Sequence, residues 1–121
     1  MAKYSHLKVF KDFYDFSKIC LNSIRLYPRL FKYTLGDKIQ DNIYHIIEQM
    51  VKANSINHKY EILSETIVNA ELLQIQLRLS KDMHCFVNLN VWVELSNRLI
   101  LILKQLEGWK KSQKTTAPGQ N

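Results

Sequence analysis

The chain has 121 residues and a formal net charge of +6, and this length suits one domain with a real hydrophobic core. Its composition, 46% hydrophobic and 23% charged, excludes general disorder, and its three Gly and two Pro favour helices over a β fold with many turns. The longest apolar run, residues 99–103, is far too short to span a bilayer, and residues 1–6 are too polar for a signal peptide, so a soluble cytoplasmic protein is predicted.

The first two segments with helical periodicity are residues 7–27 and 34–53. Their apolar residues recur at spacings of three, four or seven, which places them on one face of an amphipathic helix. Pro28 disfavours helical geometry at the preceding residue and therefore marks the end of the first helix. Thr34 is the expected N-cap of the second helix, with Asp37 in its first turn. The expected core residues of these helices are Val9, Phe13, Phe16, Cys20, Tyr27, Leu35, Ile39, Ile43, Ile46, Met50 and Ala53.

The third segment, residues 59–83, carries two apolar arcs on different sides of one helix, although a bundle core needs only one of them. The fourth, residues 87–109, is apolar on nearly all sides, which a small single chain cannot bury. This excess predicts self-association through these two helices. The expected core residues are Leu63, Ile67, Ala70, Leu73, Leu77, Trp92, Leu95, Leu99, Ile102 and Leu106. The predicted interface residues are Val68, Leu72, Ile75, Leu79, Val91, Val93, Ile100 and Leu101.

Four helices with short connections predict an all-α fold, an antiparallel up-down-up-down four-helix bundle. Cyclic symmetry is the default for a homo-oligomer of such a domain. The bundle domain is expected over residues 1–112, and residues 113–121 are expected to form a disordered polar tail. The sequence shows neither an internal repeat nor a second domain.

Patterns for enzymatic or metal-binding chemistry are weak. His45 and Glu48 are three residues apart, but bundle metal sites use repeated pairs in the opposite order, so a surface pair is predicted. His84 and Cys85 point about 100° apart on a helix, which does not suit a nucleophile and its base. Cys20 and Cys85 are expected as core side chains rather than as a disulfide. No catalytic residue, metal or cofactor is predicted.

One enzymatic alternative uses Arg78 and His84, whose spacing fits the loose Arg-x(4–6)-His pattern of HEPN ribonucleases, which are also helical bundles. In such an enzyme the His acts as acid and base, while the Arg stabilises charge on the phosphate. The residue after the Arg is Leu79, where a polar residue is often found. The structural alternative is a solvated Arg and a His near a helix C-terminus, where the helix dipole favours cations.

Positive charge gathers in the first and last parts of the sequence. Residues 1–32 carry seven Lys and Arg against two Asp, residues 104–121 carry four Lys against one Glu, and residues 33–103 have a net charge of −2. The first and last helices of a bundle can be neighbours, so these segments are predicted to form one basic field for phosphates, with solubility charge as the alternative. Tyr27, Phe31 and Tyr33 are candidates to stack on bases, with core packing as the alternative. The predicted nucleic-acid-binding residues are Lys8, Lys11, Lys18, Arg25, Arg29, Lys32, Arg78, Lys104, Lys110, Lys111 and Lys114.

Two sequence elements carry a family resemblance. Residues 27–39 read Tyr-Pro-Arg-Leu-Phe-Lys-Tyr-Thr-Leu-Gly-Asp-Lys-Ile, and residues 106–109 read Leu-Glu-Gly-Trp. They resemble a family of four-helix-bundle proteins encoded in ribosomal RNA intervening sequences and in diversity-generating retroelements, where the member is the accessory variability determinant. The resemblance covers residues 7–112 and implies a barrel-like homopentamer with a basic surface. Such a protein partners a reverse transcriptase and its template RNA and is not itself catalytic.

The resemblance also bears on single positions. Arg78 matches a position that is commonly basic in the family, whereas Gln74 stands where a second Arg can occur. Leu103 lies where the family often keeps a small residue, so the packing of the last helix is expected to differ. Gly36 is expected at a close approach between helices, since a glycine inside a helix costs about 1 kcal/mol relative to alanine.

The leading prediction is a non-catalytic accessory protein of a diversity-generating retroelement. It binds RNA and DNA through Lys and Arg and partners a reverse transcriptase in mutagenic complementary-DNA synthesis. The alternatives are an RNA-cleaving helical bundle of the HEPN type and a structural scaffold with no role in nucleic-acid binding. No membrane partner is predicted.

Overall fold

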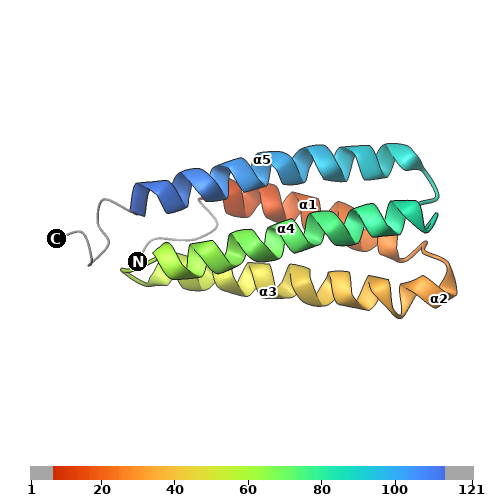
Figure 1. Ribbon diagram of the computed structural model, residues 1–121, viewed down its shortest axis with the longest axis horizontal. Coiled ribbons are helices and arrows are strands. Elements are labelled where there is room, and N and C mark those ends of the chain that lie inside the picture. The colour runs from red at the N-terminus through yellow and green to blue at the C-terminus, as the bar shows by residue number, and fades with distance from the viewer. Residues whose placement is uncertain (1–6, 114–121) are drawn as a thin grey trace.

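The structure is a computed structural model that describes residues 7–113. These residues form four long helices and one short helix, with no strand (Figure 1): α1 (Lys8–Ile24), α2 (Arg29–Lys32), α3 (Leu35–Ser55), α4 (Tyr60–Asp82) and α5 (Leu89–Gln113). The long helices run up, down, up and down, so that α1 begins and α5 ends at the same end of the bundle. The predicted all-α four-helix bundle is confirmed.

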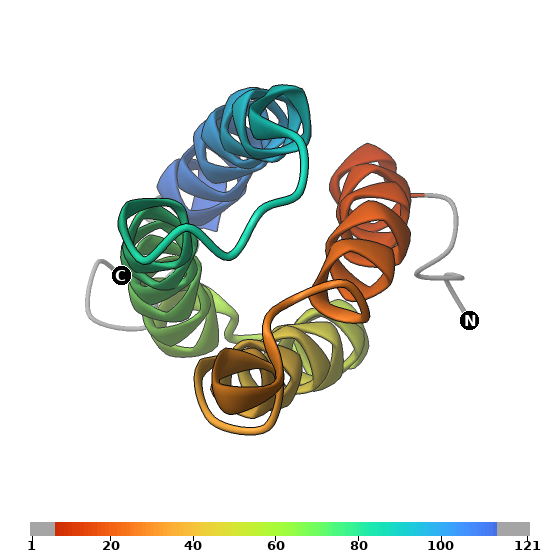
Figure 2. The ribbon, with the colours of Figure 1, turned by 90° about the vertical axis from the view of Figure 1, so that its right-hand side faces the viewer.

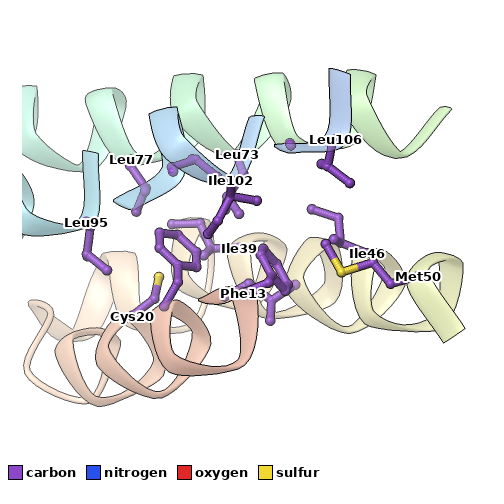
Figure 3. Close-up of a cluster of buried hydrophobic side chains, with 14 of the residues drawn as sticks. Phe13, Cys20, Ile39, Ile46, Met50, Leu73, Leu77, Leu95, Ile102 and Leu106 are labelled. Atoms are coloured by element: carbon purple, nitrogen blue, oxygen red, sulfur yellow. The ribbon is translucent and has the colours of Figure 1, made fainter. Parts of the chain in front are cut away.

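The long helices form a ring around one core. α1 packs against α3 and α5, α4 also packs against α3 and α5, and α1 and α4 lie diagonally opposite each other (Figure 2). The core contains side chains from all four helices, including Phe13 of α1, Ile46 of α3, Leu73 of α4 and Ile102 of α5 (Figure 3). The first and last long helices are therefore neighbours, as predicted, because the bundle closes between α1 and α5.

The expected core residues lie inside the bundle. All of those listed for the first and third segments are buried, as are those of the other two segments except Leu35 and Trp92, which are half-buried. Burial also raises the pKa of the Cys20 thiol to about 12 and raises the pKa of Cys85. Both cysteines are free, so they are core side chains, as predicted.

The turn between α1 and α3 differs from the prediction in two respects. The first helix ends at Ile24 rather than at Tyr27, and Arg29–Lys32 form the unpredicted single turn α2. Pro28 starts this turn, since its carbonyl accepts hydrogen bonds from the backbone N–H groups of Phe31 and Lys32. Thr34 does occupy the N-cap of α3, but its hydroxyl donates to Leu30 O at 2.7 Å and makes no cap hydrogen bond.

Gly36 allows α3 to approach the end of α1 closely. A Cβ atom at this position would lie 2.8 Å from Cγ2 of Ile24 and 3.2 Å from the carbonyl oxygen of Phe31. Ile24 is buried and therefore has little free space to move into, and the second neighbour is a backbone atom that a side-chain rotation cannot move. The expected close approach at Gly36 is therefore present.

A layer of amide side chains joins α3 to α4. Asn42 Nδ2 donates to Asn69 O at 2.9 Å and to Gln76 Oε1 at 3.0 Å, and Asn69 Nδ2 donates to Gln49 Oε1 at 3.1 Å. Asn42 and Gln49 are buried, and a buried amide that loses its partner costs about 1–3 kcal/mol. The layer therefore favours one alignment of the two helices over alternatives that leave these groups unpaired.

The second apolar arc of α4 faces outward, as its periodicity predicts. Ile75 is 64% exposed, and Val68, Leu72 and Leu79 are also exposed. On α5 the predicted interface residues Val93, Ile100 and Leu101 are exposed, whereas Val91 is half-buried and packs against the core. We refer to the four exposed side chains Val68, Leu72, Ile75 and Leu79 as the α4 arc.

The end of α5 lies close to the predicted domain boundary. The helix continues through Gln113, the first residue of the predicted tail, and residues 114–121 lie outside the described part of the chain. None of the described helices combines the length and the hydropathy that a membrane span requires.

Candidate nucleic-acid interface

The predicted binding residues form separate groups on the bundle. Lys8, Lys11 and Lys18 lie on α1, and Lys104, Lys110 and Lys111 lie near the end of α5. Arg25, Arg29 and Lys32 lie at the opposite end, around α2 (Figure 1). Arg78 is on α4, diagonally across from α1, and Lys114 lies outside the described residues. The structure thus places the cations of α1 and α5 on neighbouring helices and separates Arg78 from those of α1.

Three cations form a line along the outer side of α1. Lys11, Lys18 and Arg25 are seven residues apart, so they share one face at intervals of about 10 Å, and all three are exposed. Tyr14 lies between the first two, with Lys18 Nζ 5.2 Å from its ring centroid. Lys18 also lies 3.5 Å from a carboxylate oxygen of Asp15. We call Lys11, Lys18 and Arg25 the α1 stripe.

At the end where α1 begins, some cations already have partners. Lys8 Nζ donates to Asp12 Oδ2 at 2.6 Å, and Gln105 Nε2 of α5 donates to the same oxygen at 2.8 Å. The hydrogen bond from Lys8 is the largest cause of the lowered pKa of Asp12. Lys110 lies over the ring of Tyr60 on α4, 5.4 Å from its centroid. Lys104 and Lys111 are exposed, and their seven-residue spacing places them on one outer face of α5.

The α2 end of the bundle carries an exposed aromatic ring among cations. Arg29 Cζ and Lys32 Nζ lie 5.8 Å and 5.6 Å from the ring centroid of Tyr33. Tyr33 is 58% exposed. Among the described residues, neither Arg29 nor Lys32 forms an ion pair with a carboxylate. This combination of an open ring and unneutralised cations suits a base with its flanking phosphates.

The other two candidate aromatics pack inward, as the core-packing alternative predicts. Tyr27 is buried, makes an edge contact with Phe86 at a centroid distance of 5.6 Å, and has its pKa raised by burial. Phe31 is half-buried and packs against the core. Both residues lie in the segment that joins α1 to α3 and supply apolar side chains that pack against the core there.

The residues proposed for enzymatic chemistry occupy structural positions. His84 has a φ of 60° and follows α4, and the N–H of Cys85 donates to Ser80 O at 2.9 Å, an arrangement typical of a Schellman cap. The Cys85 thiol is buried with a raised pKa, which disfavours the reactive thiolate. His45 Nδ1 lies 3.8 Å from Glu48 Oε1 on the surface of α3. Within the described residues, no group of three or more His, Cys, Asp and Glu side chains could hold a metal ion.

The cap at His84 leads to a stability prediction. His84→Gly is expected to raise the free energy of unfolding by about 1 kcal/mol, because glycine adopts a positive φ without the steric cost that histidine bears. Urea denaturation would measure this gain. His45→Gly is the matched control, since a glycine in the exposed interior of α3 should instead lower stability by a few tenths of a kcal/mol. A loss of stability in His84→Gly would contradict the cap, and loss of an RNA-cleaving activity would favour the ribonuclease alternative.

Comparison with known proteins gives one family match. The model of a family described as bAvd-like matches residues 7–113, the same residues that the structure describes as the bundle. The comparisons with curated proteins and with solved structures found no match. The family match confirms the resemblance predicted from residues 27–39 and 106–109.

Proposed function

This chain belongs to the bAvd-like family, and we propose that it is a non-catalytic accessory protein of a diversity-generating retroelement. In this role it binds RNA and DNA through its basic surface and partners a reverse transcriptase during mutagenic complementary-DNA synthesis. The observation that carries the proposal is the family match over the whole bundle. The arrangement of the cations supports it.

The distribution of charge on the bundle suits a phosphate backbone. The α1 stripe places three exposed cations at intervals of about 10 Å along one helix, and α5 adds Lys104 and Lys111 on the neighbouring helix. Among the described residues, the only ion pair that involves one of these five cations joins Lys18 to Asp15. Cations without carboxylate partners can replace the counterions that phosphates hold, which favours sequence-independent binding.

The proposed function includes assembly into a cyclic homo-oligomer, with five copies as the expected number. The α4 arc supports this part of the proposal, because four exposed apolar side chains on one helix face are costly to leave in water. Burying an apolar side chain of this kind contributes about 1.5–3 kcal/mol. A ring would also repeat the α1 stripe in every copy and so increase the avidity for a long nucleic acid.

The salt dependence of binding tests the nucleic-acid role. Affinity for an RNA or DNA oligonucleotide, measured by fluorescence anisotropy, is expected to fall linearly with salt on logarithmic axes. The variant Lys11→Gln with Lys18→Gln should weaken binding to all sequences alike and reduce the slope by about 1.4 on a single strand. Its control, Lys52→Gln with Arg98→Gln, removes the same charge from α3 and α5, and Arg98 is already paired with Glu94 at 3.0 Å. The control should keep the slope of the unaltered protein.

The outcomes separate the proposed function from its alternatives. No binding at low salt, or binding that salt does not affect, would contradict the nucleic-acid role and favour a scaffold that acts only through proteins. Cleavage of the RNA during the measurement would favour the ribonuclease. Equal losses in the two double variants would mean that net charge alone attracts the oligonucleotide, without a contribution from the α1 face.

A further inference from the structure

The α2 end of the bundle presents one exposed aromatic side chain, and the backbone around it is held by contacts with the bundle. Tyr33 follows α2 directly, in the segment that joins α1 to α3 at this end of the bundle (Figure 2). Tyr27 and Phe31 pack into the core on one side of it. The Thr34 hydroxyl donates to Leu30 O at 2.7 Å, and α3 begins at Leu35 on the other side. Because the backbone on both sides of Tyr33 is held by these contacts, little backbone entropy is lost when its ring contacts a ligand.

The surroundings of Tyr33 resemble a site for one nucleotide. Its ring is more than half exposed, and Arg29 and Lys32 lie within 6 Å of its centroid without carboxylate partners among the described residues. Arg25, at the end of the α1 stripe, adds an exposed cation in the segment that joins α1 to α2. A base that stacks on the ring would take the place of the cations over it, and these cations would then be free to pair with the phosphates on either side of the base.

This arrangement selects for unpaired nucleotides. In a duplex both faces of each base are covered by stacked neighbours, so a protein ring cannot stack without disrupting the helix. A single strand offers its base faces freely, and stacking on an aromatic side chain does not depend strongly on which base is present. Resting on the proposed nucleic-acid role, we infer that Tyr33, Arg29 and Lys32 form a stacking platform for an unpaired nucleotide, and that the protein prefers single strands to duplexes.

A lipid surface is the alternative ligand for the α2 end of the bundle, because this end carries both apolar and cationic side chains. Leu26 and Leu30 are exposed at this end, beside the same cations. Interfacial binding uses an amphipathic helix that lays an apolar face along the membrane, however, and α2 consists of only four residues. The pairing of one aromatic ring with two cations fits a base and its phosphates better than it fits lipid.

Fluorescence of a 2-aminopurine base in a single-stranded oligonucleotide tests the platform. The full chain should quench this fluorescence on binding, because a stacked 2-aminopurine emits weakly. Tyr33→Ala is expected to lose the quenching and to lower affinity for the single strand about tenfold, whereas Tyr33→Phe should retain both. Tyr44→Ala is the matched control, since Tyr44 is similarly exposed at 52% but lies on α3, and no cation is recorded over its ring among the described contacts.

The same titrations with a duplex of equal length complete the experiment. Tyr33→Ala should bind the duplex as the unaltered protein does, so that its preference for single strands falls. If salt-sensitive binding persists but Tyr33→Ala and Tyr44→Ala behave alike, the platform is wrong and the proposed function stands. If neither oligonucleotide binds, both proposals fail. If Tyr33→Ala instead loses binding to phosphatidylserine vesicles and keeps its affinity for single strands, the α2 end contacts lipid and the proposed stacking platform is wrong.

Discussion

Replacing Ile75 with lysine is expected to convert an assembled protein into a folded single copy. Ile75 is the most exposed member of the α4 arc, so the substitution leaves the core of the bundle unchanged. In an assembly it removes about 1.5–3 kcal/mol of apolar burial and adds the several kcal/mol needed to desolvate an ammonium group. Together these weaken association by more than about a hundredfold. Sedimentation velocity would measure the number of copies, and circular dichroism would confirm that the helices remain.

Tyr44→Lys provides the control for this experiment. Tyr44 is also exposed, but it lies on α3 and outside the predicted interface, so its substitution should leave the assembly intact. An Ile75→Lys protein that still assembles would place the interface on another face of the bundle. If the unaltered protein sediments as a single well-folded copy, the proposed assembly is wrong.

Alanine substitutions at Gly36 and Gly108 are expected to change the free energy of unfolding in opposite directions. At Gly36 the new methyl group would press on Ile24 and on the carbonyl of Phe31, and such overpacking costs about 1–3 kcal/mol. At Gly108 no atom lies within 4 Å of a new Cβ, so the better helix propensity of alanine should stabilise α5 by up to about 1 kcal/mol. Urea denaturation of the two variants would measure both changes.

The sign of the change in unfolding free energy for Gly36→Ala shows how closely α3 is packed against α1 and α2. A gain in stability equal to that of Gly108→Ala would show that α1 and α2 can move away from α3 at little cost. A loss would confirm that the approach of α3 to Ile24 requires a residue without a side chain. Gly108→Ala serves as the control for the effect of helix propensity alone.

The core could be predicted from the sequence because side chains that face a bundle interior recur at helical spacing. Leu63, Ile67 and Leu73 are buried for this reason, and the outward direction of Leu72 and Ile75 follows from the same periodicity. The short helix α2 could not be predicted, since four residues show no period. Pro28 indicates only that the first helix has ended by the preceding residue. It does not indicate that the helix ends earlier, at Ile24.

The candidate site was less predictable, because its composition depends on which helices are neighbours. Lys110 of α5 lies over the ring of Tyr60 on α4, and Gln105 of α5 donates to Asp12 of α1, the partner of Lys8. The three aromatics after α1 look equivalent in sequence, and only Tyr33 is exposed. The signal that could have identified it is local: Tyr33 has Lys32 beside it in sequence and directly precedes the N-cap of α3.

The amide layer between α3 and α4 has a consequence for the geometry of a ring of copies. Sliding α4 along α3 by one turn, about 5.4 Å, would separate Asn42 from both of its acceptors, so the α4 arc is held at one height relative to Tyr33. A closed ring that uses this arc would therefore hold the Tyr33 side chains of all copies at one defined height relative to the ring interface. Hydrogen bonds inside one subunit would thereby fix the distance between the interface of the ring and the rim that carries the proposed stacking platforms.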